Sequence, residues 1–258
     1  MTPAHWIALA LLGLGYALAL FHGHLGLAAL PALLALCCTA LLVRRRAGWQ
    51  RVLGHGLFIV LALALVLHWL PGFQGAKVID KVVFSNGALP FSMYLNLDKP
   101  LIGFWILLAC PWVLTLRGRG LLPSLGLVLP LTLLACLGGA WSLGMVGWAP
   151  KWPEQSWIWA LNNLLLVSLT EELLFRGYIQ GGLQRLFRHQ GLALIVAALL
   201  FGLEHLESGW QWFYLASLAG IGYGLAYRLG GLSAAVLCHF AVNLTHFALF
   251  TYPMLAPV

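Results

Sequence analysis

Charged residues are scarce in this chain. Of its 258 residues only 8% are charged, whereas 62% are hydrophobic. A typical soluble domain has about 25% charged and about 45–50% apolar residues, so the composition excludes an ordinary soluble protein. Continuous runs rich in Leu and Ala recur, near the roughly 17–25 residues that cross a bilayer as a helix. They lack the alternation expected of membrane β-strands. We therefore expect an all-α protein, a polytopic transmembrane helical bundle.

Two common sequence signals are missing as well. No CxxC pair occurs, and all five cysteines fall in apolar runs, which indicates small core residues rather than a redox or zinc site. The N-terminal stretch MTPAHWIALALLGLG lacks the positive segment that precedes the apolar core of a signal peptide. We expect this stretch to be the first membrane helix.

The apolar runs predict about nine helices. They cover residues 5–21, 25–43, 52–71, 101–116, 120–147, 157–183, 191–206, 210–228 and 232–251. The segment 73–100, rich in Gly, Pro and Asn, is the one long loop expected, and we interpret it as an ordered connector with interfacial aromatics rather than a substrate gate.

The basic residues predict an orientation for these helices. The arginines fall in alternate loops, and the four lysines fall in the others, mixed with Asp80, Asp98 and Glu154. The arginines concerned are Arg44, Arg45, Arg46, Arg51, Arg117, Arg119, Arg185, Arg188 and Arg228. Short loops rich in Lys and Arg stay in the cytoplasm, so the N-terminus is expected inside. The formal charge of +7 then reflects topology and attraction to anionic membrane lipids, and no nucleic-acid partner is needed to explain it.

Few ionisable groups remain at membrane depth, and nearly all lie in the last third of the chain. They are Glu171, Glu172, Arg176, Glu204, His205, His239 and His246, with Asn243 as a polar neighbour. A charge within the membrane is costly, which makes each of these groups a candidate for function by default. The alternative is an internal salt bridge that fixes helix packing.

The helical spacing separates these groups by role. Glu172 and Arg176 are four residues apart, so they share a face and can pair. Glu171 points about 100° away and needs another partner or water; a carboxylate in a dry site suits general acid–base chemistry. His239 and Asn243 also share a face, where two donors could stabilise an oxyanion or form an interhelical hydrogen bond. His205 ends its helix, where an interfacial structural role is equally open.

Three motifs, each within an apolar helix, resemble those of a known family. EELLFR (171–176) has the form EExxxR, FGLEH (201–205) the form FxxxH and HFAVN (239–243) the form HxxxN. In this order they resemble the signature motifs of the CAAX protease and bacteriocin-processing (CPBP or Abi) family, which includes the CAAX prenyl endopeptidases. The resemblance covers about residues 157–250.

The resemblance implies an intramembrane glutamic-type endopeptidase without a cofactor. Glu171 would activate a water molecule with help from His205, while His239 and Asn243 would stabilise the oxyanion and Glu172 and Arg176 would support the site. The substrate would be a membrane-associated protein or peptide, possibly lipidated or membrane-anchored, at a prokaryotic cytoplasmic membrane. Residues 151–258 would form the catalytic core; residues 1–150 carry no matching motif, and their role is unassigned.

Three alternatives remain open from the sequence. Glu171, His205 and His239 could instead bind zinc with water as a fourth ligand, although no HExxH occurs. The polar cluster could also serve packing in a non-catalytic immunity or scaffold protein. A transporter is disfavoured because the two halves of the chain show no internal repeat.

Overall fold

The computed structural model describes residues 3–114 and 120–256. The chain divides into two compact units: Met1–Ala76 with Tyr94–Val113, and Lys77–Met93 with Leu114–Val258. The second unit therefore includes a short segment that lies between two parts of the first unit in the sequence. All of the motif residues belong to the second unit.

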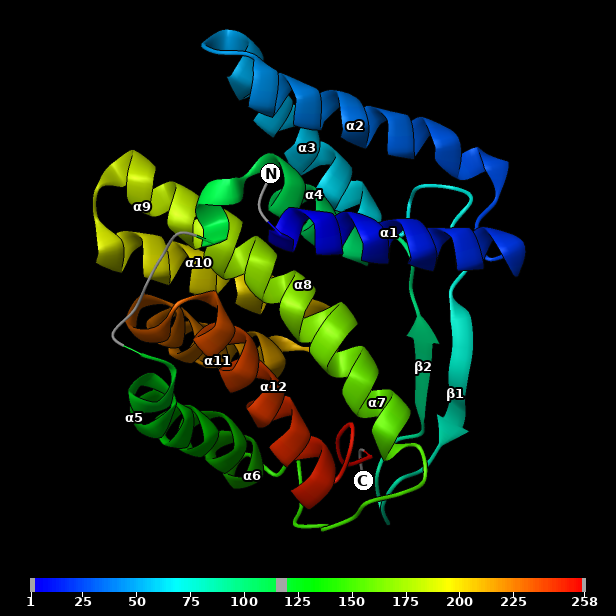
Figure 1. Cartoon of the computed structure of the whole chain (residues 1–258). Helices are drawn as coiled ribbons and strands as arrows, with labels where there is room; N and C mark the ends of the chain where they lie inside the picture. The colour runs from blue at the N-terminus through cyan, green and yellow to red at the C-terminus, as the bar shows by residue number, and fades with distance from the viewer. Residues whose placement is uncertain (1–2, 115–119, 257–258) are drawn as a thin grey trace. The chain divides into compact units, whose positions relative to one another are not determined.

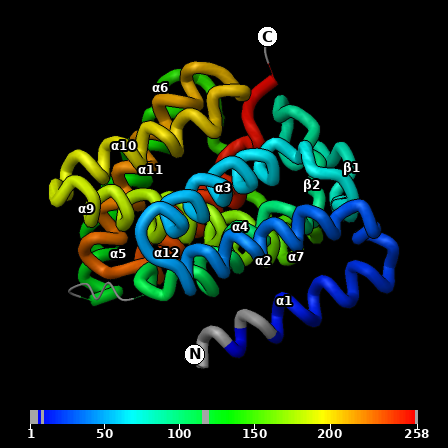
Figure 2. The backbone as a smooth tube through the Cα atoms, turned by 90° about the horizontal axis from the view of Figure 1, so that it is seen from above, coloured from blue at the N-terminus to red at the C-terminus, as the bar shows by residue number. Residues whose placement is uncertain are grey.

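The first unit consists of four apolar helices. They are α1 (Pro3–Phe21), α2 (Leu30–Arg45, preceded by the short turn η1, Leu27–Ala29), α3 (Trp49–Val66) and α4 (Lys99–Ala109). Helices α2 and α3 lie side by side (Figure 2), and α4 packs against α1, α2 and α3. Trp105 of α4 stacks on Phe58 of α3 with ring centroids 3.5 Å apart, and its indole N–H donates to the Leu36 carbonyl of α2. One side chain thus joins three helices.

The second unit is a bundle built around α11 (Trp210–Gly230). The first of its other helices is α5 (Leu121–Leu133), which continues through η3 (Leu134–Gly138) into α6 (Gly139–Ser142). The others include α10 (Gln190–Glu204, followed by the turn η6, Leu206–Ser208) and α12 (Leu232–Leu249). Helix α11 packs against α5, α10 and α12 (Figure 1), which makes it the centre of this bundle.

Small residues let α10 and α11 approach closely. A Cβ atom built on Gly220 of α11 would lie 3.0 Å from the Cα of Ala198 on α10, and one on Gly202 of α10 would lie 2.8 Å from the Phe213 carbonyl oxygen. In membrane helices, where lipid removes most of the hydrophobic drive for association, such close contacts are a main source of packing energy. Larger side chains at these two glycines would push the helices apart.

The motif EELLFR lies in one continuous helical stretch, Ser156–Phe187, whose turns vary in width. It comprises α7 (Ser156–Asn162), η4 (Asn163–Ser168), α8 (Leu169–Glu172), η5 (Leu173–Gln180) and α9 (Gly181–Phe187). Segments η4 and η5 are π-helical, with wider turns than an α-helix. Such segments often occur at functional sites, and here they flank the turn that carries both glutamates.

The predicted loop 73–100 contains two strands that the sequence interpretation missed. Strands β1 (Ala76–Val82) and β2 (Phe91–Leu95) pair in a two-stranded sheet. Within the second unit, Ile79 and Met93 of this hairpin pack against Trp159 of α7 and Phe247 of α12. The Asn86–Gly87 pair between two runs rich in β-branched and aromatic residues is a hairpin signal. It was available in the sequence, and Gly87 indeed has a positive φ of 73°.

The helical prediction is confirmed within the described residues, which contain nine helices. Two predicted bounds were wrong. The third helix ends at Val66 rather than 71, and α4 stops at Ala109 because Pro111 cannot continue a helix, leaving only the turn η2 (Pro111–Leu114).

Five helical stretches among the described residues are long and apolar enough to cross a membrane. They are Leu27–Arg45, Trp49–Val66, Leu121–Ser142, Ser156–Phe187 and Leu232–Leu249. The protein is accordingly an integral membrane protein. Its orientation stays a prediction, and two of the arginines on which it depends, Arg117 and Arg119, lie outside the described residues.

Candidate active site

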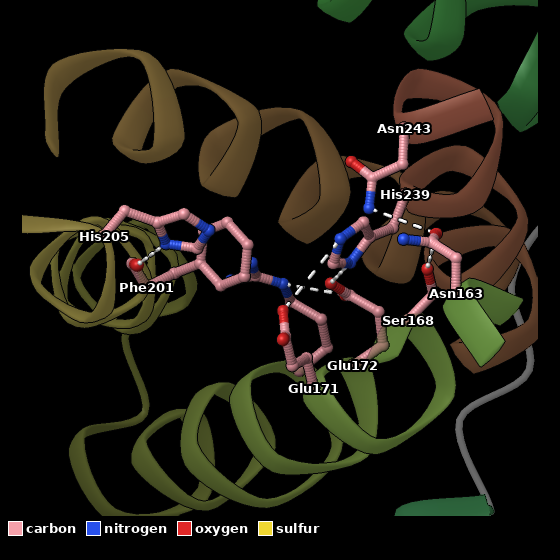
Figure 3. A network of polar contacts seen from close by, with 9 residues as sticks. Asn163, Ser168, Glu171, Glu172, Phe201, His205, His239 and Asn243 are labelled. Atoms are coloured by element: carbon pink, nitrogen blue, oxygen red, sulfur yellow. Dashed lines mark hydrogen bonds and ion pairs between the residues drawn. The ribbon is translucent and has the colours of Figure 1, made fainter. Parts of the chain in front are cut away.

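Three helices of the second unit bring the motif residues together. Both glutamates lie on α8, and Arg176 follows in η5; His205 comes directly after α10; His239 and Asn243 lie on α12. A cavity of about 130 Å³ is lined by Glu171, His205, His239 and Asn243, among others. Because one water molecule needs only about 10–15 Å³ on this scale, the cavity has room for several. All four residues predicted to be catalytic thus face one space (Figure 3).

The two adjacent glutamates have different surroundings. The side chain of Glu172 is fully buried, and its Oε2 accepts a hydrogen bond of 3.0 Å from Arg176 Nε. Glu171 lines the cavity, with its side chain 19% exposed. The predicted pairing of Glu172 with Arg176 is therefore confirmed, as is the divergence of Glu171 from it.

Arg176 is a fully buried cation held by one carboxylate and several ring faces. Its guanidinium carbon lies 5.2 Å from the ring centre of Phe201 and 5.9 Å from those of Phe175 and Tyr223. Neither Nη atom has a hydrogen-bond partner among the described residues. Cation–π attraction is strongest where water is excluded, and here it takes the place of further hydrogen bonds.

His239 connects the buried ion pair to the cavity. Its Nδ1–H donates to Glu172 Oε1 over 2.9 Å, and its Nε2 lies 4.0 Å from Glu171 Oε2. The ring stacks on Tyr223, with centroids 4.5 Å apart and planes 11° apart, and meets the edge of Phe201. The link to Glu172 was not predicted. It fixes the tautomer of His239 and directs Nε2 toward the side where Glu171 lies (Figure 3).

Asn243 is held by a residue that the sequence interpretation missed. Its Nδ2 donates to Oδ1 of Asn163 over 3.2 Å, and the same oxygen accepts from Ser168 Oγ over 3.3 Å. Asn163 is buried in the first turn of η4, eight residues before Glu171. A carboxamide inside an apolar membrane helix is itself unusual, and that signal could have identified Asn163 before the structure was known. For Tyr223, in an apolar helix, we find no such signal.

His205 lies at the end of α10, as predicted. Its Nδ1–H donates to the Phe201 carbonyl over 3.0 Å, and its ring packs against the Phe201 ring with centroids 4.9 Å apart. In this tautomer the lone pair of the neutral imidazole is on Nε2. The phenylalanine of the FxxxH motif therefore contacts three site residues at once: His205, His239 and Arg176.

The described residues were also searched for side chains that could bind a metal ion. No group of three or more His, Cys, Asp or Glu side chains in residues 3–114 and 120–256 is arranged to do so. The zinc alternative therefore has no preformed ligand set in this part of the chain.

The fold and site together define a helical membrane protein with a cavity that holds one carboxylate, two imidazoles and an amide. Residues 153–245, somewhat over a third of the chain, match the family model described as type II CAAX prenyl endopeptidase Rce1-like. The match confirms the resemblance to the CAAX protease family and spans all three motifs. It supports a CAAX-type intramembrane endopeptidase. No curated protein and no solved structure matches the chain.

Proposed function

We propose that the protein is an intramembrane endopeptidase in which Glu171 activates a water molecule for attack on a peptide bond. The observation that carries this proposal is the shared cavity, where Glu171, His205, His239 and Asn243 meet from three helices. A carboxylate at the edge of a water-sized space has the position that a general base requires.

The chemistry follows from the groups in the cavity. Glu171 takes a proton from water, with His205 as a second acceptor for hydrogen bonding, and the hydroxide attacks the carbonyl carbon. Asn243 Nδ2–H and His239 Nε2–H donate to the oxyanion that forms. Protonated Glu171 then gives its proton to the leaving amide nitrogen as the C–N bond breaks. Water is consumed, two peptide ends are released, and no covalent intermediate is needed.

His239 can act as such a donor in only one of its protonation states. Because Nδ1–H is already used by Glu172, Nε2 donates only when the ring carries both protons. Glu172 partners the resulting positive charge, and Arg176 in turn balances Glu172. The buried pair thus supports the oxyanion site without touching the substrate.

The substrate class follows from the family description. A CAAX-type enzyme acts on a protein or peptide in a membrane, and we propose a membrane-associated protein, lipidated or membrane-anchored. Membrane lipids surround the enzyme, and no cofactor enters the steps above.

The experiment compares Glu171→Gln with the wild-type protein. The change removes the base at nearly constant shape, so we expect loss of cleavage by at least about 10²-fold, with folding intact. Quantitative proteomics of membrane and secreted fractions from cells with either form identifies processed substrates. Glu207→Gln, at an exposed glutamate outside the cavity, is the matched control. Cleavage at the wild-type rate by Glu171→Gln overturns the proposal and favours the scaffold alternative, which predicts function without Glu171.

The role of metal is tested separately. We expect cleavage by the purified protein to continue in a strong chelator, and inductively coupled plasma analysis to find less than stoichiometric zinc. One zinc per chain together with inhibition by the chelator would instead favour Glu171, His205 and His239 as ligands.

A further inference from the structure

The cavity extends beyond the proposed catalytic groups. Its lining also includes Trp212, from the first turn of α11, and His246, from the last turn of α12. Their ring centres are 6.2 Å apart, so the two side chains are neighbours. His239 and His246 are seven residues apart on one helix. This places them on the same face, about 10 Å apart along the axis.

Both side chains carry a buried polar atom without a partner. Among the described residues, neither Nε2 of His246 nor Nε1 of Trp212 has a hydrogen bond. The His246 ring is held by an edge contact with Tyr252, with centroids 5.1 Å apart, and by a hydrogen bond to the Thr251 backbone. Buried polar atoms in native proteins are seldom left unpaired. Two neighbouring ones beside a cavity indicate that something else pairs with them.

We infer that Trp212 and His246 form a subsite that binds one main-chain peptide group of the substrate, an inference that rests on the proposed function. The indole N–H of Trp212 donates to the peptide carbonyl, and Nε2 of His246 accepts from the peptide N–H. A peptide group presents one acceptor and one donor, which matches this pair. A carboxylate would bring two acceptors and a charge into a site with one fixed donor.

The spacing predicts which peptide group is bound. An extended chain advances about 3.3 Å per residue. The 10 Å, approximately, between His239 and His246 along α12 therefore corresponds to about three residues. The bound group lies about three residues from the carbonyl that is attacked beside His239. This contact would hold the substrate in an extended conformation and in a fixed register.

The test varies the substrate and the protein together. The probe is a fluorogenic prenylated peptide with a CAAX ending, made also as a series in which single peptide bonds near the cut are replaced by esters. An ester lacks the N–H that His246 would accept. In the wild-type protein we expect one ester, about three residues from the cut, to raise KM about threefold to tenfold, the worth of one hydrogen bond, at nearly constant kcat.

The protein variants show whether that effect passes through the subsite. In His246→Phe the same ester should cost nothing further, and Trp212→Phe should raise KM by a similar factor. Trp210→Phe is the matched control, since this tryptophan is 62% exposed and does not line the cavity. An ester penalty of equal size in wild type and His246→Phe overturns the subsite, as does equal tolerance of all esters by the wild type. The second result indicates a pair that binds water alone, and it needs no variant to fold.

Failure of the subsite differs from failure of the proposed function. Cleavage that is lost in Glu171→Gln, with KM unchanged in Trp212→Phe, overturns the subsite alone. If the wild-type protein cleaves nothing, the proposed function fails, and fluorescence anisotropy of the labelled peptide then measures binding directly. Equal Kd values for wild type and Trp212→Phe overturn the subsite in that case, whereas weaker binding by the variant supports it.

Discussion

Replacing Glu172 by Gln should destabilise the protein far more than the same change at its neighbour Glu171. Both Glu172 and Arg176 have side chains that are 0% exposed, so Glu172→Gln leaves a buried guanidinium without a carboxylate. Removing one partner of a buried ion pair costs about 3–5 kcal/mol. A protein of this size loses about 2–4 °C of melting temperature per kcal/mol. The expected decrease is therefore roughly 6–20 °C.

Thermal unfolding in detergent, followed by a thiol-reactive dye, provides the assay. Cys110, Cys136 and Cys238 are buried and become reactive when the protein unfolds. Glu171→Gln is the control, with an expected shift of less than about 2 °C, because surface-like changes of this kind usually cost under about 0.5 kcal/mol.

A double variant separates the charge from the shape of the pair. Glu172→Gln with Arg176→Met removes both charges, and replacing a whole buried pair is often nearly neutral. The double variant should melt above Glu172→Gln alone. Equal melting temperatures for Glu172→Gln and Glu171→Gln would refute the reasoning, since the buried pair would then contribute nothing.

Three further predictions concern other parts of the second unit. Asn163→Leu should lower kcat about tenfold or more with KM unchanged, because it removes the acceptor that orients the Asn243 amide; Asn163→Asp, which keeps an acceptor, should restore most of the loss. Trp159→Ala should destabilise by about 3–5 kcal/mol, since its ring is 1% exposed and stacked on Phe247. The same change at Trp157, 70% exposed, should cost far less. Burial lowers the pKa of Lys151 from 10.5 to about 8. Between these values the unfolded chain binds more protons than the folded protein, so stability should rise with pH across that window, and Lys151→Met should not show the rise.

The sequence predicted the helices and the pairing of charges well because both depend on local spacing. Glu172 and Arg176 lie four residues apart, and that spacing alone gave their ion pair. Composition likewise predicted membrane helices, since a long apolar run has few other stable structures.

The contacts between helices could not be predicted in the same way. The bond from His239 to Glu172 joins residues 67 positions apart, and the bond from Asn243 to Asn163 joins residues 80 apart. Such pairs depend on how the helices pack, which a single sequence does not specify. The π-helical turns on either side of α8 also change which side chains share a face, and no residue pattern in this chain announces them.

The hairpin that packs on α7 and α12 has a consequence for anyone who wishes to isolate the catalytic bundle. Its residues, Lys77–Met93, precede the family-like segment 153–245 by some sixty positions, yet they complete the same compact unit. A truncated chain limited to the matched segment would expose the indole of Trp159 and lose Phe247 altogether. Hydrolytic machinery and its structural support are thus interleaved along the polypeptide, so this bundle cannot be excised, transplanted or shortened from the N-terminus as one contiguous cassette.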